Sequence, residues 1–177
     1  MNKKKWIFVL GIIGAIFLTI VIFKNYFSHS RKHHEYNVQH LHPKVQSAME
    51  QLIRKAQRKG ISIRITEGFR SFDQQDQLYS QGRKKPGPIV TNAKGGQSYH
   101  NYGLAIDFAL YDEKTHQLSW DIKKDGNKNG ISDWQEVVYE AKKLGFSWGG
   151  DWEQFKDYPH LEMTFGQSID ELQEMLN

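Results

Sequence analysis

The pattern of apolar and polar positions divides the chain into an uncharged apolar run near its start and a longer part with helix- or strand-like periodicity. The run covers residues 6–23, which is close to the shortest length for a helix that crosses a bilayer. Three lysines precede it, and no small-x-small cleavage pattern follows it. We therefore expect residues 1–27 to form a lysine-rich cytoplasmic tip and an uncleaved transmembrane signal anchor, with the remainder on the outer side of the membrane. The alternative is a cleaved signal peptide and a secreted protein.

Residues 28–40 are polar, rich in histidine and without periodicity, which is typical of a linker. Residues 41–177 carry regular patterns and are expected to form one folded domain. Pro43 starts a helix whose apolar residues recur at steps of three and four, and Gly60 ends it. Ser71 starts a second helix, because Gln74 three positions later completes a capping box.

The remaining periodic segments complete an α+β pattern. Alternating apolar and polar residues predict strands at 61–66, at 105–110 and in the second half of 157–165. Helical spacing predicts two more helices, at about 133–144 and 168–176. Long loops are expected at 83–97 and, rich in aromatic residues and glycine, at 146–152. We predict a small antiparallel sheet flanked by helices.

Composition narrows the chemistry. The chain has 177 residues, no cysteine, eight histidines and a formal charge of +4. The absence of cysteine excludes disulfides, thiolate zinc sites and cysteine nucleophiles, so a metal would be held by histidine and carboxylate. The charge is mildly basic, and no stripe of lysine and arginine interleaved with aromatic residues suggests nucleic-acid binding.

His100 and Asp107 are candidate zinc ligands, and Gly103 and Ala105 between them would let the chain turn close to a metal. His160, at the start of a predicted strand, is the natural third ligand. Three such ligands would leave the fourth position of a catalytic zinc open. Each residue alone is more often structural, and only their joint presence favours a metal.

Three further residues could take part in catalysis at such a site. Asp157 lies three positions before His160, where its carboxylate could take a proton from an attacking water and deliver it to a leaving amine. Arg70 lies where a strand ends and a helix begins, and could polarise a scissile carbonyl or hold a substrate carboxylate. Ser98 is expected to hydrogen-bond near a ligand or the substrate.

Residues 125–136 match the twelve-residue calcium loop at every liganding position. The candidate ligands are Asp125, Asn127, Asn129, the carbonyl of Ile131, Asp133 and Glu136. No good helix precedes this loop, and no second copy exists to pair with it. We therefore expect a weak calcium site at most, and the alternative is a turn whose Asp and Asn residues cap the helix that follows.

The motif Ser98-x-His100-x-x-Gly103-x-Ala105-x-Asp107, followed by Asp157-x-x-His160, resembles the signature of a family of bacterial zinc peptidases. This family comprises D-alanyl-D-alanine carboxypeptidases, D-alanyl-D-alanine dipeptidases and L-alanyl-D-glutamate endopeptidases. The resemblance covers about residues 41–166 and extends to Leu41-His-Pro43, Gly68-Phe-Arg-Ser71, Gln75-x-x-Leu-Tyr79, Gly82-Arg83 and Trp148-Gly-Gly-Asp-Trp152.

The resemblance implies one zinc ion held by His100, Asp107 and His160, with Asp157 as general base and Arg70 as a stabiliser of the substrate or transition state. It also implies that further residues lie near the zinc or the substrate, namely Ser98, Gln75, Trp148, Asp151 and Trp152. The carboxypeptidase and dipeptidase branches typically have Glu in place of Asp157. The Asp-x-Pro-His form resembles the endopeptidases that cut the L-Ala–D-Glu bond of peptidoglycan stem peptides.

These features predict a monomeric, membrane-tethered zinc peptidase that acts on peptidoglycan stem peptides. A D-alanyl-D-alanine carboxypeptidase is the nearest alternative. A non-catalytic zinc-containing binding module is the alternative of another class. The expected transmembrane anchor departs from the family, whose members are commonly secreted, lipid-anchored or free.

Overall fold

The structure is a computed structural model that describes residues 40–176. The expected signal anchor and all but the last residue of the expected linker lie outside the described residues. Within 40–176, no helix is long and apolar enough to cross a membrane. The domain boundaries after residues 27 and 40 therefore stay predictions.

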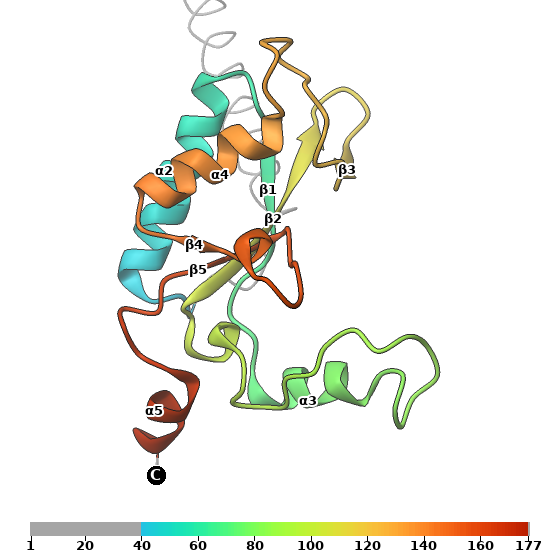
Figure 1. Cartoon of the computed structure of the whole chain (residues 1–177), viewed down its shortest axis with the longest axis vertical. Coiled ribbons are helices and arrows are strands. Elements are labelled where there is room, and N and C mark those ends of the chain that lie inside the picture. The colour runs from blue at the N-terminus through green and yellow to red at the C-terminus, as the bar shows by residue number, and fades with distance from the viewer. Residues whose placement is uncertain (1–39, 177) are drawn as a thin grey trace, which may run out of the picture. The chain divides into compact units, whose positions relative to one another are not determined.

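The described part combines helices with one small sheet (Figure 1). In chain order the elements are α2 (Pro43–Arg58), β1 (Ile63–Glu67), α3 (Phe72–Ser80), the short 3-10 helix η1 (Tyr99–Tyr102), β2 (Ala105–Asp112), β3 (Gln117–Ser119), α4 (Asp133–Lys143), β4 (Ser147–Trp148), the 3-10 helix η2 (Gly149–Asp151), β5 (His160–Glu162) and α5 (Ile169–Glu174). The strand order is β1-β2-β5-β4, and β3 pairs with β2. Every pairing is antiparallel, which confirms the predicted α+β class and the small antiparallel sheet.

Helix boundaries follow the local signals in the sequence. Proline opens α2, whose apolar stripe is buried. The predicted capping box opens α3, because the backbone N–H of Ser71 donates to Gln74 Oε1 at 2.8 Å and the N–H of Gln74 donates to Ser71 Oγ at 3.2 Å. Each of these bonds satisfies an N–H group that a helix start would otherwise leave unpaired.

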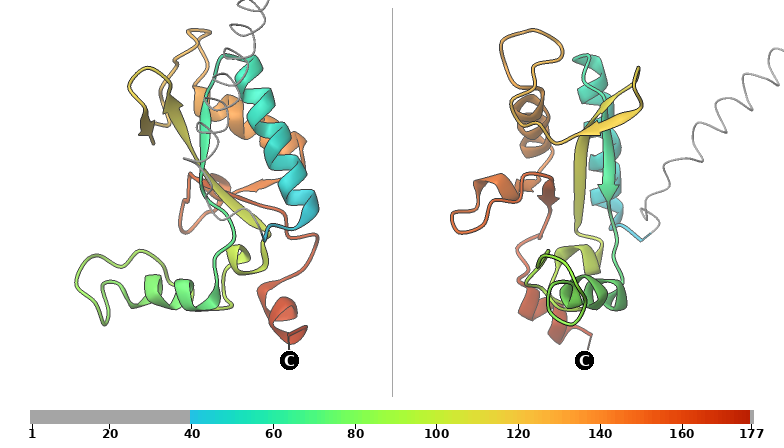
Figure 2. Two further views of the ribbon diagram at one scale, coloured as in Figure 1. Left: turned by 180° about the vertical axis from the view of Figure 1, so that it is seen from behind. Right: turned by 90° about the vertical axis from the view of Figure 1, so that its right-hand side faces the viewer.

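The core forms where α2 and α4 pack against each other and against the strands (Figure 2). Strand alternation places Ile106 and Leu161, which face each other across β2 and β5, in this core. The neighbouring pair, Asp107 and His160, therefore lies on the other face of the sheet. Each large apolar side chain that is fully buried contributes roughly 1.5–3 kcal/mol, so the helix-covered face holds the sheet rigid behind the polar pair.

Three short strands differ from the prediction. No strand was expected at β3, and β4 with η2 lies within the segment 146–152 that was expected to be a loop. The strand expected in the second half of 157–165 is confined to the three residues of β5. Runs of two or three residues are too short to show a period, so pairing with a neighbour decides them.

Candidate metal centre

Three separate elements bring the predicted ligands together. Asp107 on β2 and His160 on β5 are direct partners in the antiparallel register. His100 comes from η1, whose carbonyl at that residue accepts the backbone N–H of Arg70 at 3.1 Å. In the described part of the chain, these three residues form the group of acidic and imidazole side chains that could hold a metal ion.

The donor atoms have the spacing of a zinc site. His100 Nε2 lies 3.2 Å from His160 Nδ1 and 3.3 Å from Asp107 Oδ1, and His160 Nδ1 lies 3.2 Å from Asp107 Oδ1. Tetrahedral zinc with bonds of about 2.0–2.1 Å holds its donors about 3.3–3.4 Å apart. The three atoms thus form one face of a tetrahedron of the right size for zinc.

The outer nitrogen of each ring determines which atom faces the centre. His100 Nδ1 lies 2.7 Å from the Gly68 carbonyl oxygen, which can only accept, so this nitrogen carries the proton. His160 Nε2 lies 3.0 Å from Glu162 Oε2 and carries the proton in the same way. The two inner nitrogens and the Asp107 carboxylate then converge as three lone-pair donors. Such an arrangement repels itself unless a cation lies between them.

The pKa values of the donor groups reflect their close packing. Burial disfavours the charged form of His160, yet its hydrogen bonds with Asp107 and Glu162 raise its pKa to about 9. Burial also opposes the ionisation of Asp107, but hydrogen bonds with both histidines hold the pKa of this carboxyl well below its ordinary value. Without a metal the centre therefore binds a proton, which a metal ion would displace.

Asp157 lies in the same cleft and is held by the aromatic loop. Its backbone N–H donates to the Gly149 carbonyl at 3.1 Å, and Trp148 Nε1 donates to the Tyr158 carbonyl at 2.7 Å. A Cβ atom on Gly149 would lie 2.5 Å from the Asp157 carbonyl oxygen and 3.1 Å from His160 Cβ, so only glycine fits. Burial and the nearby Asp107 charge raise the pKa of Asp157.

Arg70 is fixed in place by two acceptors. Its Nη1 donates to Gln75 Oε1 at 2.8 Å, and its Nη2 lies 3.3 Å from Glu67 Oε2. Its buried Nε has no hydrogen-bond partner among the described residues. Gln75 is itself fully buried and donates to the Ala93 carbonyl at 2.8 Å, so it orients Arg70 without lining the cleft.

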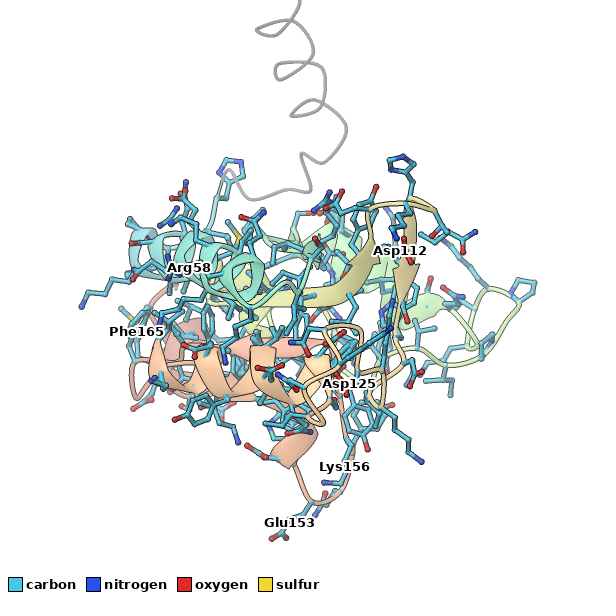
Figure 3. All side chains as sticks on the ribbon, turned by 90° about the horizontal axis from the view of Figure 1, so that it is seen from above. Arg58, Asp112, Asp125, Glu153, Lys156 and Phe165 are labelled. Atoms are coloured by element: carbon cyan, nitrogen blue, oxygen red, sulfur yellow. The ribbon has the colours of Figure 1, made fainter. Side chains whose placement is uncertain are left out.

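A cleft of about 730 Å³ joins these groups. Of the predicted site residues, it is lined by Arg70, Ser98, His100, Asp107, Trp152, Asp157 and His160. The ring centroid of Trp152 lies 5.2 Å from that of His160. The loop between η2 and β5 borders the cleft through Trp152, Phe155 and Asp157. Glu153 and Lys156 lie at the outer end of this loop (Figure 3).

Three predicted site residues lie outside this lining, namely Gln75, Trp148 and Asp151. Trp148 is buried beneath the loop, where it supports the Asp157–His160 turn as described above. Asp151 is exposed and forms an ion pair with Lys142 of α4. The resemblance implies that Trp148 and Asp151 lie near the zinc or the substrate, but a sequence motif does not show which way a loop side chain points.

Gly103 lets the chain turn between His100 and Asp107, as predicted, because it ends η1 in the left-handed conformation. Its φ of 67° is in the left-handed region, and a Cβ atom there would lie 2.3 Å from the His40 carbonyl oxygen. The absence of a side chain also lets the chain that leads into α2 pass close to this residue. Ala105 is fully buried within β2.

Sequence reasoning missed Glu162. A signal was present, because residues 160 and 162 of one strand point to the same face. This spacing places the Glu162 carboxylate on the same side of the sheet as the His160 ring.

Polar side chains of the segment 125–136 hydrogen-bond with one another and with its backbone. Glu136 Oε2 accepts hydrogen bonds from the side-chain amides of Asn127 and Asn129, both at 2.8 Å, and its Oε1 lies 3.1 Å from Lys59 Nζ. Asp133 accepts the backbone N–H of Gly126 at 2.9 Å. These are the contacts expected of the alternative, a capped turn before α4.

Comparisons with known proteins agree with this geometry. A family model described as D-alanyl-D-alanine carboxypeptidase matches residues 91–163. The chain is 63% identical over 123 residues to the peptidoglycan L-alanyl-D-glutamate endopeptidase CwlK of Bacillus subtilis, an alignment that covers 70% of this chain and 73% of that protein. It is 32% identical over 130 residues to the L-alanyl-D-glutamate peptidase of Listeria phage A118, which covers 73% of this chain and 40% of the phage protein.

Among solved structures, the LdcB LD-carboxypeptidase has a TM-score of 0.52 at 18% identity, over 76% of this chain and 68% of that one. This likeness shows the fold alone. The match to CwlK, at 63% identity over 73% of that protein, shows the family as well as the fold. The chain belongs to the bacterial zinc peptidase family of D-alanyl-D-alanine carboxypeptidases and L-alanyl-D-glutamate endopeptidases.

Proposed function

We propose that this chain is a zinc-dependent peptidoglycan endopeptidase that hydrolyses the L-Ala–D-Glu bond of stem peptides. The observation that carries the proposal is the convergence of His100, Asp107 and His160, with donor atoms 3.2–3.3 Å apart, in a cleft that also contains Asp157 and Arg70. The choice of bond is supported by the relatives CwlK and the phage A118 enzyme, both named for cutting between L-alanine and D-glutamate.

The three donors would hold one zinc ion, which supplies Lewis acidity for a polarised carbonyl and an activated water. Asp157 then takes a proton from the water as the new C–O bond forms. It returns that proton to the amine nitrogen as the C–N bond breaks. Its raised pKa suits this exchange, because a carboxylate that is partly desolvated is a stronger base than one in water.

Arg70 presents its guanidinium to the same cleft. Because Gln75 and Glu67 already hold two of its nitrogens, the side chain cannot swing away when the substrate is absent. A fixed cation beside the metal centre would stabilise the oxygen that gains negative charge, or a carboxylate of the stem peptide.

The test is digestion of purified peptidoglycan by the protein, with and without a zinc chelator, followed by mass spectrometry of the new termini. We expect fragments with N-terminal D-Glu, and no cleavage in chelator. Asp157→Asn should lower the rate by about 10²–10⁴-fold while zinc stays bound. Glu174→Gln, on the exposed end of α5, is the matched control.

Other outcomes would identify the alternatives. Free D-Ala in place of N-terminal D-Glu would identify a D-alanyl-D-alanine carboxypeptidase. Zinc binding without any product would identify a binding module. Full activity in zinc-loaded Asp157→Asn would refute the role of Asp157 as base.

We also place the catalytic domain on the cell-wall side of the membrane, as a monomer tethered by residues 6–23. Support comes from the sequence pattern and from the location of the substrate outside the cytoplasm. Sedimentation of the full-length chain with membranes, resistant to high salt, is the expected result. Release into the medium as a shorter chain would show a cleaved signal peptide instead.

A further inference from the structure

Glu162 places a second carboxylate against the candidate metal centre. It is 9% exposed, and its Oε2 lies 3.0 Å from His160 Nε2, the ring nitrogen that faces away from the other donors. The side chain lies on the same face of β5 as His160, because the two residues are two positions apart in one strand.

The backbone around this carboxylate is held on both sides. Glu162 is paired with Ala105 of β2 and with Ser147 of β4, so β5 is an inner strand at this point. The pairing fixes the backbone of Glu162, and the burial of its side chain limits the rotamers that it can adopt. The sheet therefore keeps the Glu162 carboxylate next to the His160 ring.

Burying a carboxylate is costly unless a charge or strong donor compensates it. Glu162 pairs with His160, whose ring is neutral when it binds a metal. The positive charge that compensates the Glu162 carboxylate is then that of the metal ion bound by Nδ1, on the opposite side of the imidazole ring. Two neutral imidazoles with Asp107 and Glu162 carry a total charge of −2, which a divalent cation neutralises.

We propose that Glu162 is a positioning residue for the metal centre, whose carboxylate holds the His160 proton on Nε2 and so directs the Nδ1 lone pair toward zinc. This inference rests on the proposed function, since it concerns the affinity of the same site for zinc. It assigns Glu162 no contact with the reacting atoms. Carboxylates behind metal-bound histidines commonly increase metal affinity by about 10–100-fold.

The experiment measures the zinc dissociation constant by competition with a chromophoric chelator. The proteins are the wild type, Glu162→Gln, Glu162→Ala and the control Glu174→Gln. We expect zinc binding to weaken by about 10–100-fold in Glu162→Ala. The loss in Glu162→Gln should be smaller, because the amide oxygen can still accept the ring proton but carries no charge. Glu174→Gln should match the wild type.

A second measurement separates positioning from general damage to the fold. Cobalt(II) in place of zinc reports ligand geometry through its visible absorption bands. We expect these bands to change in Glu162→Ala, while cobalt-free far-ultraviolet circular dichroism stays that of the wild type. At saturating zinc, the control Glu174→Gln should keep the kcat of the wild type.

Each contrary result has a distinct meaning. Unchanged zinc affinity and cobalt spectrum in a folded Glu162→Ala would overturn the inference. A large loss of kcat at saturating zinc, with affinity unchanged, would also overturn it, because Glu162 would then act on the substrate. Failure of the wild type itself to bind zinc would refute the proposed function, a result that does not depend on any Glu162 variant.

Discussion

At the scale of single residues, buried polar side chains determine what the exposed ones can do. Gln75 is the clearest case, because it is fully buried yet uses both ends of its amide. Its oxygen accepts from Arg70 Nη1, and its nitrogen donates to the Ala93 carbonyl, each at 2.8 Å. No apolar side chain of similar size could replace either bond.

Replacing Gln75 with Met should therefore weaken catalysis without affecting the metal. Loss of a hydrogen bond to a charged group costs about 1.5–3 kcal/mol. We expect kcat/KM for stem peptides to fall at least about tenfold, while zinc affinity remains that of the wild type. Gln51→Met, on the exposed face of α2, is the control. Wild-type kcat/KM in Gln75→Met would show that Arg70 does not depend on this contact.

At the scale of elements, the two segments that the sequence predicts as loops, 83–97 and 146–152, have different structural roles. The segment 146–152 supports the candidate metal centre, because Trp148 and Gly149 hold the turn that carries Asp157. The loop 83–97 forms a wall of the cleft through residues 89–93 and 97. Arg83 ties this wall to α3, because its Nη1 donates to the carbonyls of Tyr79 and Thr91 at 2.8 and 2.9 Å.

The same guanidinium donates through Nη2 to Asn92 Oδ1 at 2.8 Å and lies 4.0 Å from the centre of the Tyr79 ring. Lysine cannot reproduce this planar fork. Arg83→Lys should therefore raise KM about tenfold and leave kcat and zinc affinity near wild-type values. Hydrogen exchange at residues 89–93 should become faster. Arg54→Lys, an exposed residue of α2, serves as the control. An unaltered KM would show that residues 89–93 keep their position without the Arg83 hydrogen bonds.

At the scale of the whole molecule, charged contacts join α2 and the residue that follows it to α4. Lys55 lies 2.8 Å from Glu140, and Lys59 lies 3.1 Å from Glu136. Burial opposes ionisation of Glu136, but hydrogen bonds from Asn127, Asn129 and Lys59 lower its pKa overall. The calcium-like loop also contacts the end of α2, because Asn127 Nδ2 donates to the Lys59 carbonyl at 3.1 Å.

A group whose pKa is lower in the folded than in the unfolded state stabilises the fold above its unfolded pKa. That contribution is lost as the pH falls through the folded pKa. Glu136→Gln should therefore lower the free energy of unfolding by about 1–3 kcal/mol at pH 7 and flatten its decline toward acid. Urea denaturation at several pH values measures both effects, with Glu174→Gln as the control.

The same denaturation experiment tests calcium. Because the loop already satisfies its own polar groups, added calcium should leave the urea midpoint of the wild type unchanged. A rise in the midpoint with calcium, absent in Glu136→Gln, would show instead that the loop binds the ion.

Local signals in the sequence were sufficient for the longer elements and for the kinds of donor at the site. Periodicity identified α2 and α4, and the Ser71–Gln74 capping box marked the start of α3. The absence of cysteine limited any metal to histidine and carboxylate ligands. These inferences succeed because helix periodicity, capping and ligand chemistry each depend on residues that are few positions apart or on composition alone.

Only the tertiary structure decided which of these residues meet. The register of β2 against β5 sets Asp107 opposite His160, and the same pairing brings Glu162 behind the ring. Gly103 and Gly149 are required by contacts with chain segments distant from them in sequence, which no local pattern records. The sequence by itself thus determined the donors and the frame. The strand register decided their geometry, because a shift of one residue would turn His160 and Glu162 to the opposite face of the sheet.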